Sequence, residues 1–224
     1  MKFISYNING IKAFQNWKFI NKTDYDFVGL QEIRNNDLTL LKSYEPKQFP
    51  YIYWSVDTKI KGHAGVAIFT KHKPINVSID NINGRYIILE YKKIYVVSCY
   101  LPHAGFKLEK LDDKLYFLDM FTSLLNKLSY KPIIVFGDFN VAPNFIDVAT
   151  PNPHAPDFTQ QERAAFLKLC KYNLLVDAYR YIHPTLVKYS YFSKRSNSYK
   201  TNNGWRIDHF LVSQSILKFV KNAT

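Results

Sequence analysis

Polar side chains suited to metal binding or phosphate chemistry stand at the ends of several short apolar runs. They come from four separate segments: Asn7 and Asn9, Glu32, Asp138 and Asn140, and Asp208. Carboxylate and amide oxygens are the ligands that Mg²⁺ and Mn²⁺ prefer, whereas the Cys and His clusters that would indicate zinc are absent from the sequence. The residue types therefore predict an oxygen-ligand metal site or a site for phosphate chemistry.

The apolar runs before these residues have the length and composition of β-strands. They cover residues 3–8, 27–30, 66–70, 133–136 and 207–212. Residues 85–91 and 94–100, rich in Ile, Val and Tyr, predict a β-hairpin, so part of the sheet is antiparallel. Leucines at helical spacing predict a helix from Leu111 to the break at Pro132, and Thr159 with Glu162 has the capping-box spacing that starts a second helix. Strands with interspersed helices predict two packed sheets covered by helices.

Composition favours a nucleic-acid partner and one domain. Lysine and arginine number 30 against 18 acidic residues, which gives a formal net charge of +12 and favours a polyanion. Cys99 and Cys170 lack metal-ligand spacing and the density of a secreted disulfide scaffold, which indicates a reducing compartment. Because no long apolar run, linker or repeat interrupts the 224 residues, we expect a soluble intracellular monomer, without membrane contact, made of a single domain over 1–224.

Seven motifs in order carry a family resemblance. They are SYNINGIKA (5–13), LQE (30–32), GVAIF (65–69), YLP (100–102), GDFNVAP (137–143), TQQER (159–163) and GWRID (204–208). The set resembles the exonuclease III type of apurinic/apyrimidinic endonucleases, within the endonuclease/exonuclease/phosphatase superfamily. One such fragment is a weak signal, whereas the ordered set is specific. The resemblance implies a DNase I-like fold, a four-layered α/β sandwich of two mixed β-sheets flanked by helices.

The resemblance also implies roles for the strand-end residues. Glu32 is expected to hold the divalent ion, and Asn9 to assist the metal directly or through water. Asp138 is expected to activate or position the attacking water, and Asn140 to donate a hydrogen bond to the phosphate or to that water. The alternatives are a solvated Glu32 and an Asx turn formed by Asp138 and Asn140.

Three further residues complete the catalytic set that the resemblance implies. Tyr100 is expected to contact the phosphate through its hydroxyl, and Asn7 to lie near the nucleophile and phosphate. Asp208 matches the aspartate that orients a histidine of a C-terminal Ser-Asp-His segment in the family. No such segment follows Asp208, and the adjacent His209 is expected to point to the opposite face of its strand. We interpret the sequence as C-terminally incomplete, lacking a late strand; the alternatives are a different histidine or a protein that mainly binds.

Four residues are expected to contact DNA. Phe192 and Trp205 resemble the wall of the family's pocket for a flipped abasic sugar, although a core role for both rings is nearly as well supported. Lys12 and Arg206 lie within the matched motifs and are further candidate contacts. His103 stands where the family usually has Asn, so the resemblance implies no DNA contact by that side chain.

Together these observations predict a Mg²⁺-dependent DNA repair phosphodiesterase, with Mn²⁺ as a substitute metal. It is expected to cleave double-stranded DNA 5′ to abasic sites, with 3′–5′ exonuclease action and cleaning of modified 3′ ends as further activities. The alternatives are a catalytically impaired DNA-binding member of the family and an inositol-phosphate or sphingolipid phosphatase. The expected location is the cytoplasm in a bacterium and the nucleus in a eukaryote. The sequence leaves the dominant activity and the number of metal ions open.

Overall fold

The structure, a computed structural model, describes all residues except 16, 23 and 194–196, and for residues 21 and 22 it describes the backbone alone. It divides into two compact units. The N-terminal unit contains residues 1–100 and 135–138, and the C-terminal unit contains residues 101–134 and 139–224. The predicted single domain over 1–224 stays a prediction.

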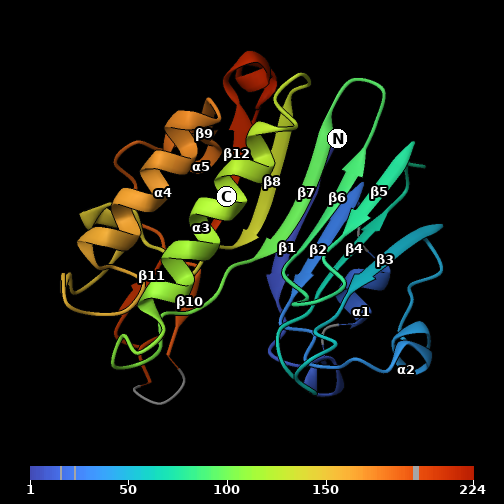
Figure 1. Ribbon diagram of the computed structural model, residues 1–224, viewed down its shortest axis with the longest axis horizontal. Coiled ribbons are helices and arrows are strands. Elements are labelled where there is room, and N and C mark those ends of the chain that lie inside the picture. The colour runs from blue at the N-terminus through green and yellow to red at the C-terminus, as the bar shows by residue number, and fades with distance from the viewer. Residues whose placement is uncertain (16, 23, 194–196) are drawn as a thin grey trace. The chain divides into compact units, whose positions relative to one another are not determined.

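A four-stranded mixed sheet lies in the N-terminal unit (Figure 1). Its order is β1-β2-β4-β3, with β1 parallel to β2 and β4 antiparallel to both β2 and β3. The bounds are β1 Phe3–Asn7, β2 Phe27–Gln31, β3 Tyr51–Ser55 and β4 Val66–Thr70, with the short helices η1 Ile11–Ala13, α1 Trp17–Lys22 and α2 Leu38–Lys42. The predicted strands at 3–8, 27–30 and 66–70 are confirmed, whereas the strand β3 was not predicted.

Both faces of this sheet are buried. Val28 and Leu30 of β2 belong to an apolar cluster with Ile20 of α1 and Leu41 of α2, so these helices cover one face. Gly29 faces the other way, where a Cβ atom would overlap the ring of Phe136. That second face contacts the larger sheet through β6 and β7.

The larger sheet has the order β5-β6-β7-β8-β12-β9. Its strands are β5 Asn76–Ile79, β6 Tyr86–Glu90, β7 Tyr95–Tyr100, β8 Ile133–Asp138, β9 Leu175–Asp177 and β12 Asp208–Ser213. The predicted hairpin is confirmed as the antiparallel pair β6 and β7, and β5 adds antiparallel to β6. The boundary between the two units falls within β8.

Gly137 in β8 allows a close approach of two backbones. Its φ is +144°, and a Cβ atom there would overlap the carbonyl oxygen of Cys99 in β7. We therefore expect Gly137→Ala to lower the free energy of unfolding by about 1–3 kcal/mol more than Gly10→Ala does. Gly10 is the matched control, because it has a φ of +102° but no atom within 4 Å of its added Cβ. Urea denaturation of both variants measures the difference, and equal losses would contradict the overlap.

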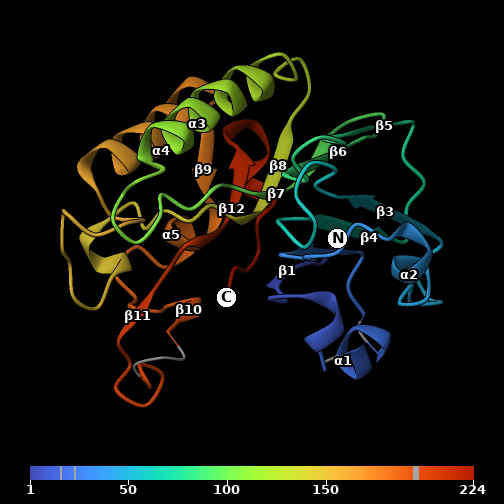
Figure 2. The same cartoon turned by 60° about the horizontal axis from the view of Figure 1, so that its bottom comes forward.

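Helices cover the strands of the C-terminal unit. They are α3 Leu111–Asn126, α4 Gln160–Tyr172 and α5 Ala178–Ile182, with the short helices η2 Phe145–Asp147 and η4 Gln214–Phe219 and the strand pair β10 Tyr191–Phe192 and β11 Gly204–Trp205. Helices α3 and α4 pack side by side, as both views show, and α5 contacts β9 and β12 (Figures 1 and 2). No helix in the described part of the chain is long and apolar enough to span a membrane.

The predicted capping box at the start of α4 is confirmed. The Thr159 hydroxyl accepts a hydrogen bond from the Glu162 backbone N–H at 3.2 Å, and the Glu162 carboxylate accepts one from the Thr159 backbone N–H at 2.9 Å. The two bonds satisfy N–H groups that the first turn of a helix otherwise leaves unpaired. They also fix the Glu162 carboxylate in the interior of the C-terminal unit, where it meets Lys114.

Candidate active site

The amide of Asn7 joins two carboxylates within the N-terminal unit. Its Nδ2 donates to Glu32 Oε1 and to Asp138 Oδ2, at 2.8 Å in each case. The orientation of the amide follows from its other end, because Oδ1 accepts a hydrogen bond from the backbone N–H of Asn9 at 3.1 Å. The ends of β1, β2 and β8 thus bring together three of the residues that the sequence predicts to act in catalysis or metal binding.

Glu32 is held at the end of β2 by an unusual backbone conformation and by an ion pair. Its φ is +56°, in the left-handed region. The flanking backbone is fixed, since Ile33 N–H donates to the Gly65 carbonyl and Arg34 N–H to the Ala64 carbonyl. The second carboxylate oxygen of Glu32 pairs with the Arg34 guanidinium. The side chain is only 14% exposed, so its two oxygens have defined directions.

These residues fit a divalent cation with few protein ligands. Mg²⁺ usually keeps several waters and is bound through one or two carboxylates, and Asn7 places the carboxylates of Glu32 and Asp138 within one hydrogen bond of a shared nitrogen. No group of three or more His, Cys, Asp or Glu side chains among the described residues could hold a metal ion. The side chain of Asn9 is exposed. The backbone N–H of Asn9 makes the hydrogen bond that orients the Asn7 amide.

Tyr100 lies at the end of β7 among charged groups. The Arg85 guanidinium carbon is 4.9 Å from the centre of its ring. Burial raises the pKa of Tyr100 well above its usual value, the charges of Glu32 and Asp138 add to this rise, and Arg85 and Arg34 oppose it. Tyr100 therefore keeps its proton at neutral pH and remains able to donate a hydrogen bond.

Asn140 is fixed from two sides in the C-terminal unit. Its φ is +48°, its Nδ2 donates to the Leu101 carbonyl at 2.8 Å, and its backbone carbonyl accepts a hydrogen bond from Lys114. Lys114 is fully buried and also pairs with Asp157 at 3.0 Å and with Glu162 at 2.6 Å. No local sequence pattern marks Lys114 as buried, although the capping box indicated where Glu162 would stand.

The segments of Asn140 and Asp208 lie side by side in the C-terminal unit. Phe139, which separates Asp138 from Asn140 in the chain, donates its backbone N–H to the Ile207 carbonyl at 2.9 Å. The backbone N–H of Asp208 donates to the Ser190 hydroxyl at 3.1 Å. The structure thus pairs Glu32 with Asp138 in one unit and brings the Asn140 and Asp208 segments together in the other. The convergence of all four on one phosphorus atom stays a prediction.

The prediction of a DNA contact by Arg206 does not fit the structure. Arg206 is only 4% exposed. Its guanidinium lies 2.8 Å from Asp147 and 2.8 Å from Asp177 in ion pairs, and 3.0 Å from His209 Nδ1. Arg180 also binds Asp147. Arg206 therefore holds buried segments together, which sequence reasoning could not detect because its partners are distant in the chain.

His209 is part of the same buried cluster. It is 2% exposed, and its Nε2 lies 2.8 Å from the Val141 carbonyl, to which an imidazole N–H donates. Its ring also contacts Phe139 and Phe166. The structure thus agrees with the interpretation that His209 is a poor substitute for the family's histidine.

Two carboxylates of this cluster have lowered pKa values. For Asp177, burial raises the pKa, but the hydrogen bond from His209 and the charge of Arg206 lower it by more, to well below the usual range. For Asp147, burial is likewise outweighed by Arg206 and then by Arg180. Both groups therefore stay ionised in the folded protein at pH values where an unfolded chain takes up protons.

We expect the free energy of unfolding to fall as the pH drops below about 4. A lowered carboxyl pKa contributes stability that is fully present above the unfolded pKa, near 3.9, and is lost as the pH falls toward the folded value. Urea denaturation between about pH 3 and pH 6 measures the free energy of unfolding. This free energy should vary less with pH in Asp177→Asn than in the wild type. Asp119→Asn is the control, because Asp119 forms an exposed pair with Lys168. If the free energy of unfolding varies equally with pH in all three proteins, the lowered pKa of Asp177 is contradicted.

The remaining candidate DNA contacts differ in exposure. Lys12 in η1 is exposed. Phe192 and Trp205 are half-buried on the paired strands β10 and β11, where Phe192 contacts the rings of Tyr189 and Tyr199 and Trp205 contacts Phe158. Their positions are compatible with a packing role and with a surface role. A DNA contact by these three residues stays a prediction.

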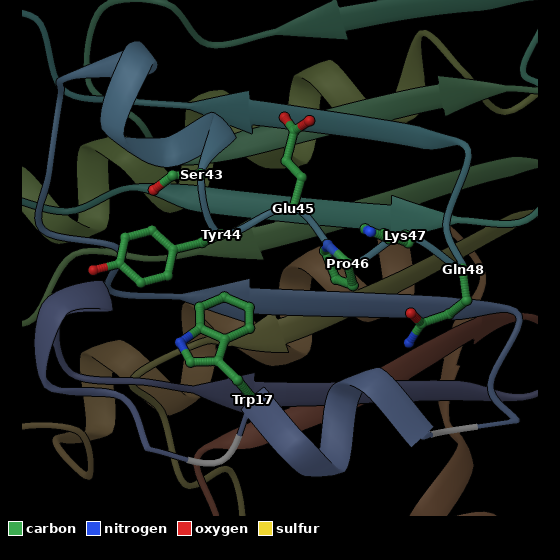
Figure 3. A pocket seen from close by; sticks show the side chains of 7 residues that line it. All are labelled: Trp17, Ser43, Tyr44, Glu45, Pro46, Lys47 and Gln48. Carbon is green, nitrogen blue, oxygen red and sulfur yellow. The ribbon is translucent and has the colours of Figure 1, made fainter.

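The N-terminal unit contains a cavity that is formed by other residues. It has a volume of about 510 Å³ and is lined by Trp17 and residues 43–48 (Figure 3). The rings of Trp17 and Tyr44 stack with centres 5.4 Å apart. None of the residues predicted to bind DNA or metal lines this cavity.

Comparisons with known proteins agree with the motifs. A model of the Endonuclease/Exonuclease/phosphatase family matches residues 4–221. The exodeoxyribonuclease of Bacillus subtilis (strain 168) is 33% identical over 238 residues, which cover 100% of this chain and 92% of that protein. The DNA-(apurinic or apyrimidinic site) endonuclease of Dictyostelium discoideum is 34% identical over 236 residues, covering 99% of this chain and 64% of that protein.

Solved structures confirm the predicted α/β fold class of two mixed sheets flanked by helices. An AP endonuclease from Archaeoglobus fulgidus superimposes with a TM-score of 0.87 at 25% identity, over 97% of this chain and 89% of that one. The AP endonuclease LMAP from Leishmania major has the same fold, with a TM-score of 0.84 at 20% identity, over 97% of this chain and 80% of that one. The chain belongs to the endonuclease/exonuclease/phosphatase family, in its exonuclease III type of AP endonucleases.

Proposed function

We propose that this chain is a Mg²⁺-dependent DNA repair nuclease that cleaves duplex DNA on the 5′ side of abasic sites. The observation that carries the proposal is the Asn7 amide, which holds a carboxylate suited to a metal ion, Glu32, beside one suited to activating water, Asp138. The names of the relatives, an exodeoxyribonuclease and an apurinic or apyrimidinic site endonuclease, support a DNA substrate. The net charge of +12 supports a polyanion. Removal of modified 3′ ends is a further activity of the same site.

Asp138 acts on the attacking water. Its carboxylate accepts a proton from the water as the water oxygen attacks the phosphorus atom. The bond between phosphorus and O3′ breaks, and the departing oxygen takes a proton from solvent. The products are a 3′-hydroxyl on one fragment and a 5′-phosphate on the abasic sugar of the other. Asn7 keeps the Asp138 carboxylate in place throughout, because its Nδ2 donates to Oδ2.

Other side chains bind the phosphate as charge develops. Glu32, assisted by Asn9 directly or through water, would hold Mg²⁺ or Mn²⁺, which when bound neutralises the added negative charge on the phosphate. The protonated phenol of Tyr100 donates a hydrogen bond to a phosphate oxygen. Asn140 would donate a hydrogen bond to the phosphate or to the attacking water, and Asp208 has the position that orients a histidine in the family. Lys12, Phe192 and Trp205 contact the DNA.

The proposal is tested with a duplex that carries one tetrahydrofuran abasic analogue. With Mg²⁺ we expect a single incision on the 5′ side of the analogue, and EDTA should abolish it. An undamaged duplex of the same sequence is the control for non-specific nuclease action. Salt-dependent binding without incision would indicate a DNA-binding member of the family instead. Phosphate release from inositol phosphates without DNA cleavage would indicate a phosphatase.

A further inference from the structure

A chain of polar contacts leads from Asp57 to Tyr100 within the N-terminal unit. His63 Nδ1 is 2.6 Å from Asp57 Oδ2, and His63 Nε2 is 3.4 Å from Arg85 Nη2. The Arg85 guanidinium carbon then lies 4.9 Å from the centre of the Tyr100 ring, within the range of a cation–π contact. Arg85 is 8% exposed, so its guanidinium is held inside the protein.

The groups that contact His63 determine which of its ring nitrogens donates a hydrogen bond and which accepts one. A guanidinium has donors only, so His63 Nε2 must accept the hydrogen bond from Arg85. A carboxylate accepts only, so Nδ1 must donate to Asp57. Both contacts are met by the tautomer that carries its proton on Nδ1, and this tautomer offers Nε2 as an acceptor to the Arg85 guanidinium.

The Asp57 carboxylate, at the start of this chain of contacts, is firmly held in place. It is 4% exposed, and its Oδ1 accepts hydrogen bonds from the backbone N–H groups of Lys59 and Ile60 at 2.8 Å each. Burial raises its pKa, but the hydrogen bond from His63 and the backbone bonds outweigh burial, so the pKa lies below its usual value. Asp57 therefore stays ionised and accepts strongly from His63.

The backbone of Arg85 is fixed against the backbone of Asp57. At Gly84 φ is +65°, and a Cβ atom there would lie 2.7 Å from the Asp57 nitrogen. The Asp80 carboxylate accepts hydrogen bonds from the backbone N–H groups of Asn83 at 3.1 Å and Arg85 at 3.3 Å. Because both loops are fixed at this contact, the side-chain link from His63 to Arg85 has a defined geometry.

We infer that His63 and Asp57 are positioning residues for Tyr100, acting through Arg85. Arg85 lies over the face of the Tyr100 ring and donates from Nη1 to the Tyr100 carbonyl at 3.5 Å, and His63 provides the acceptor for its Nη2. The inference rests on the proposed function, in which the Tyr100 hydroxyl donates to the phosphate. It assigns a role to His63, which lies outside the motifs that carry the family resemblance.

Substitutions of His63 separate its two contacts. In His63→Asn the amide nitrogen can still donate to Asp57, but no atom reaches the position of Nε2. We expect kcat for incision to fall about tenfold with KM within about twofold, because the effect lies on the transition state and not on DNA binding. His63→Gln, whose amide oxygen can accept from Arg85, should retain more of kcat. Thermal unfolding of both variants checks that they fold.

A double-mutant cycle tests the route through Tyr100. In a Tyr100→Phe background, His63→Asn should lower kcat no further, since the hydroxyl that it positions is gone. The matched control is His72→Asn, because His72 also pairs with an aspartate, Asp26 at 3.1 Å, and is similarly exposed. This control should leave kcat unchanged. Additive losses in the cycle would overturn the inference, as would an effect on KM alone, which would mean that His63 contacts DNA directly.

A spectroscopic measurement needs no activity. With tyrosine rings labelled by ¹³C, the Tyr100 resonance, assigned from its loss in Tyr100→Phe, should shift in His63→Asn and stay in place in His72→Asn. An unmoved Tyr100 resonance in His63→Asn would overturn the inference. A wild-type protein that fails to incise abasic DNA would overturn the proposed function, while the tyrosine spectrum would still decide whether His63 acts on Tyr100.

Discussion

Asp138→Asn should lower kcat for incision of an abasic duplex by about 10³, within the range expected for loss of a general base. The amide has the size of the carboxylate but does not take a proton from water. Its oxygen can still accept from Asn7 Nδ2, which donates to Asp138 Oδ2 at 2.8 Å in the native protein. We therefore expect the fold to persist and DNA to bind. Single-turnover cleavage and a filter-binding assay on the same duplex measure the two effects.

The control for this prediction is Asp112→Asn, in the first turn of α3. Asp112 is exposed and belongs to the C-terminal unit. Asp112→Asn changes the net charge by the same amount as Asp138→Asn, because each variant loses one carboxylate. It should leave kcat within about twofold of the wild type, as is usual for a surface substitution. If Asp138→Asn cleaves at the wild-type rate while it binds normally, Asp138 does not activate the water.

The sequence predicts the strands and their polar ends well because local patterns determine them. Apolar runs before Asn7, Glu32 and Asp138 form β1, β2 and β8, as predicted. Strand pairing then places the ends of β1 and β2 together, because these strands run parallel in register from Phe3 with Phe27 to Asn7 with Gln31. Asp138 comes from a strand of the other sheet and meets Asn7 through tertiary packing. The capping box of α4 is equally local and equally predictable. Shorter elements such as β9 and α5 carry no such pattern and were missed.

Charged residues whose partners are distant in sequence could not be interpreted in the same way. Arg206 stands in a motif that resembles a DNA-binding family, yet it is buried against Asp147, 59 residues away. His63 gave no local sign of its contact with Arg85, 22 residues further along the chain. In both cases the residue type is common at a surface and the partner is distant in sequence, so only the tertiary fold brings the contact about.

Lys114 is the clearest such residue, and its burial has a large energetic consequence. It follows two exposed aspartates on α3, so the local sequence does not distinguish it from a surface lysine. In the fold it is 0% exposed and pairs with Asp157 and Glu162, 43 and 48 residues away. A buried carboxylate that loses its cation keeps the cost of its own desolvation, so removing the lysine should cost far more than the pair itself contributes.

Lys114→Met should therefore lower the free energy of unfolding by about 3–5 kcal/mol, the range for breaking a buried ion pair. Methionine fills much of the same volume but leaves Glu162, which is also 0% exposed, and the Asn140 carbonyl without their cationic partner. Urea denaturation at neutral pH measures the loss. Lys168→Met is the control, because it removes an exposed pair with Asp119 and should cost less than about 1 kcal/mol.

A second substitution set separates charge from packing at Lys114. When Asp157→Asn and Glu162→Gln are added to Lys114→Met, no uncompensated charge remains, so part of the lost stability should return. Incision should stay impaired even so, because the lysine also holds the backbone carbonyl of Asn140, and the neutral triple variant does not restore that hydrogen bond. Recovery of kcat together with stability would mean that Lys114 serves the fold alone. Recovery of stability without kcat would show that the hydrogen bond from Lys114 also sets the position of Asn140.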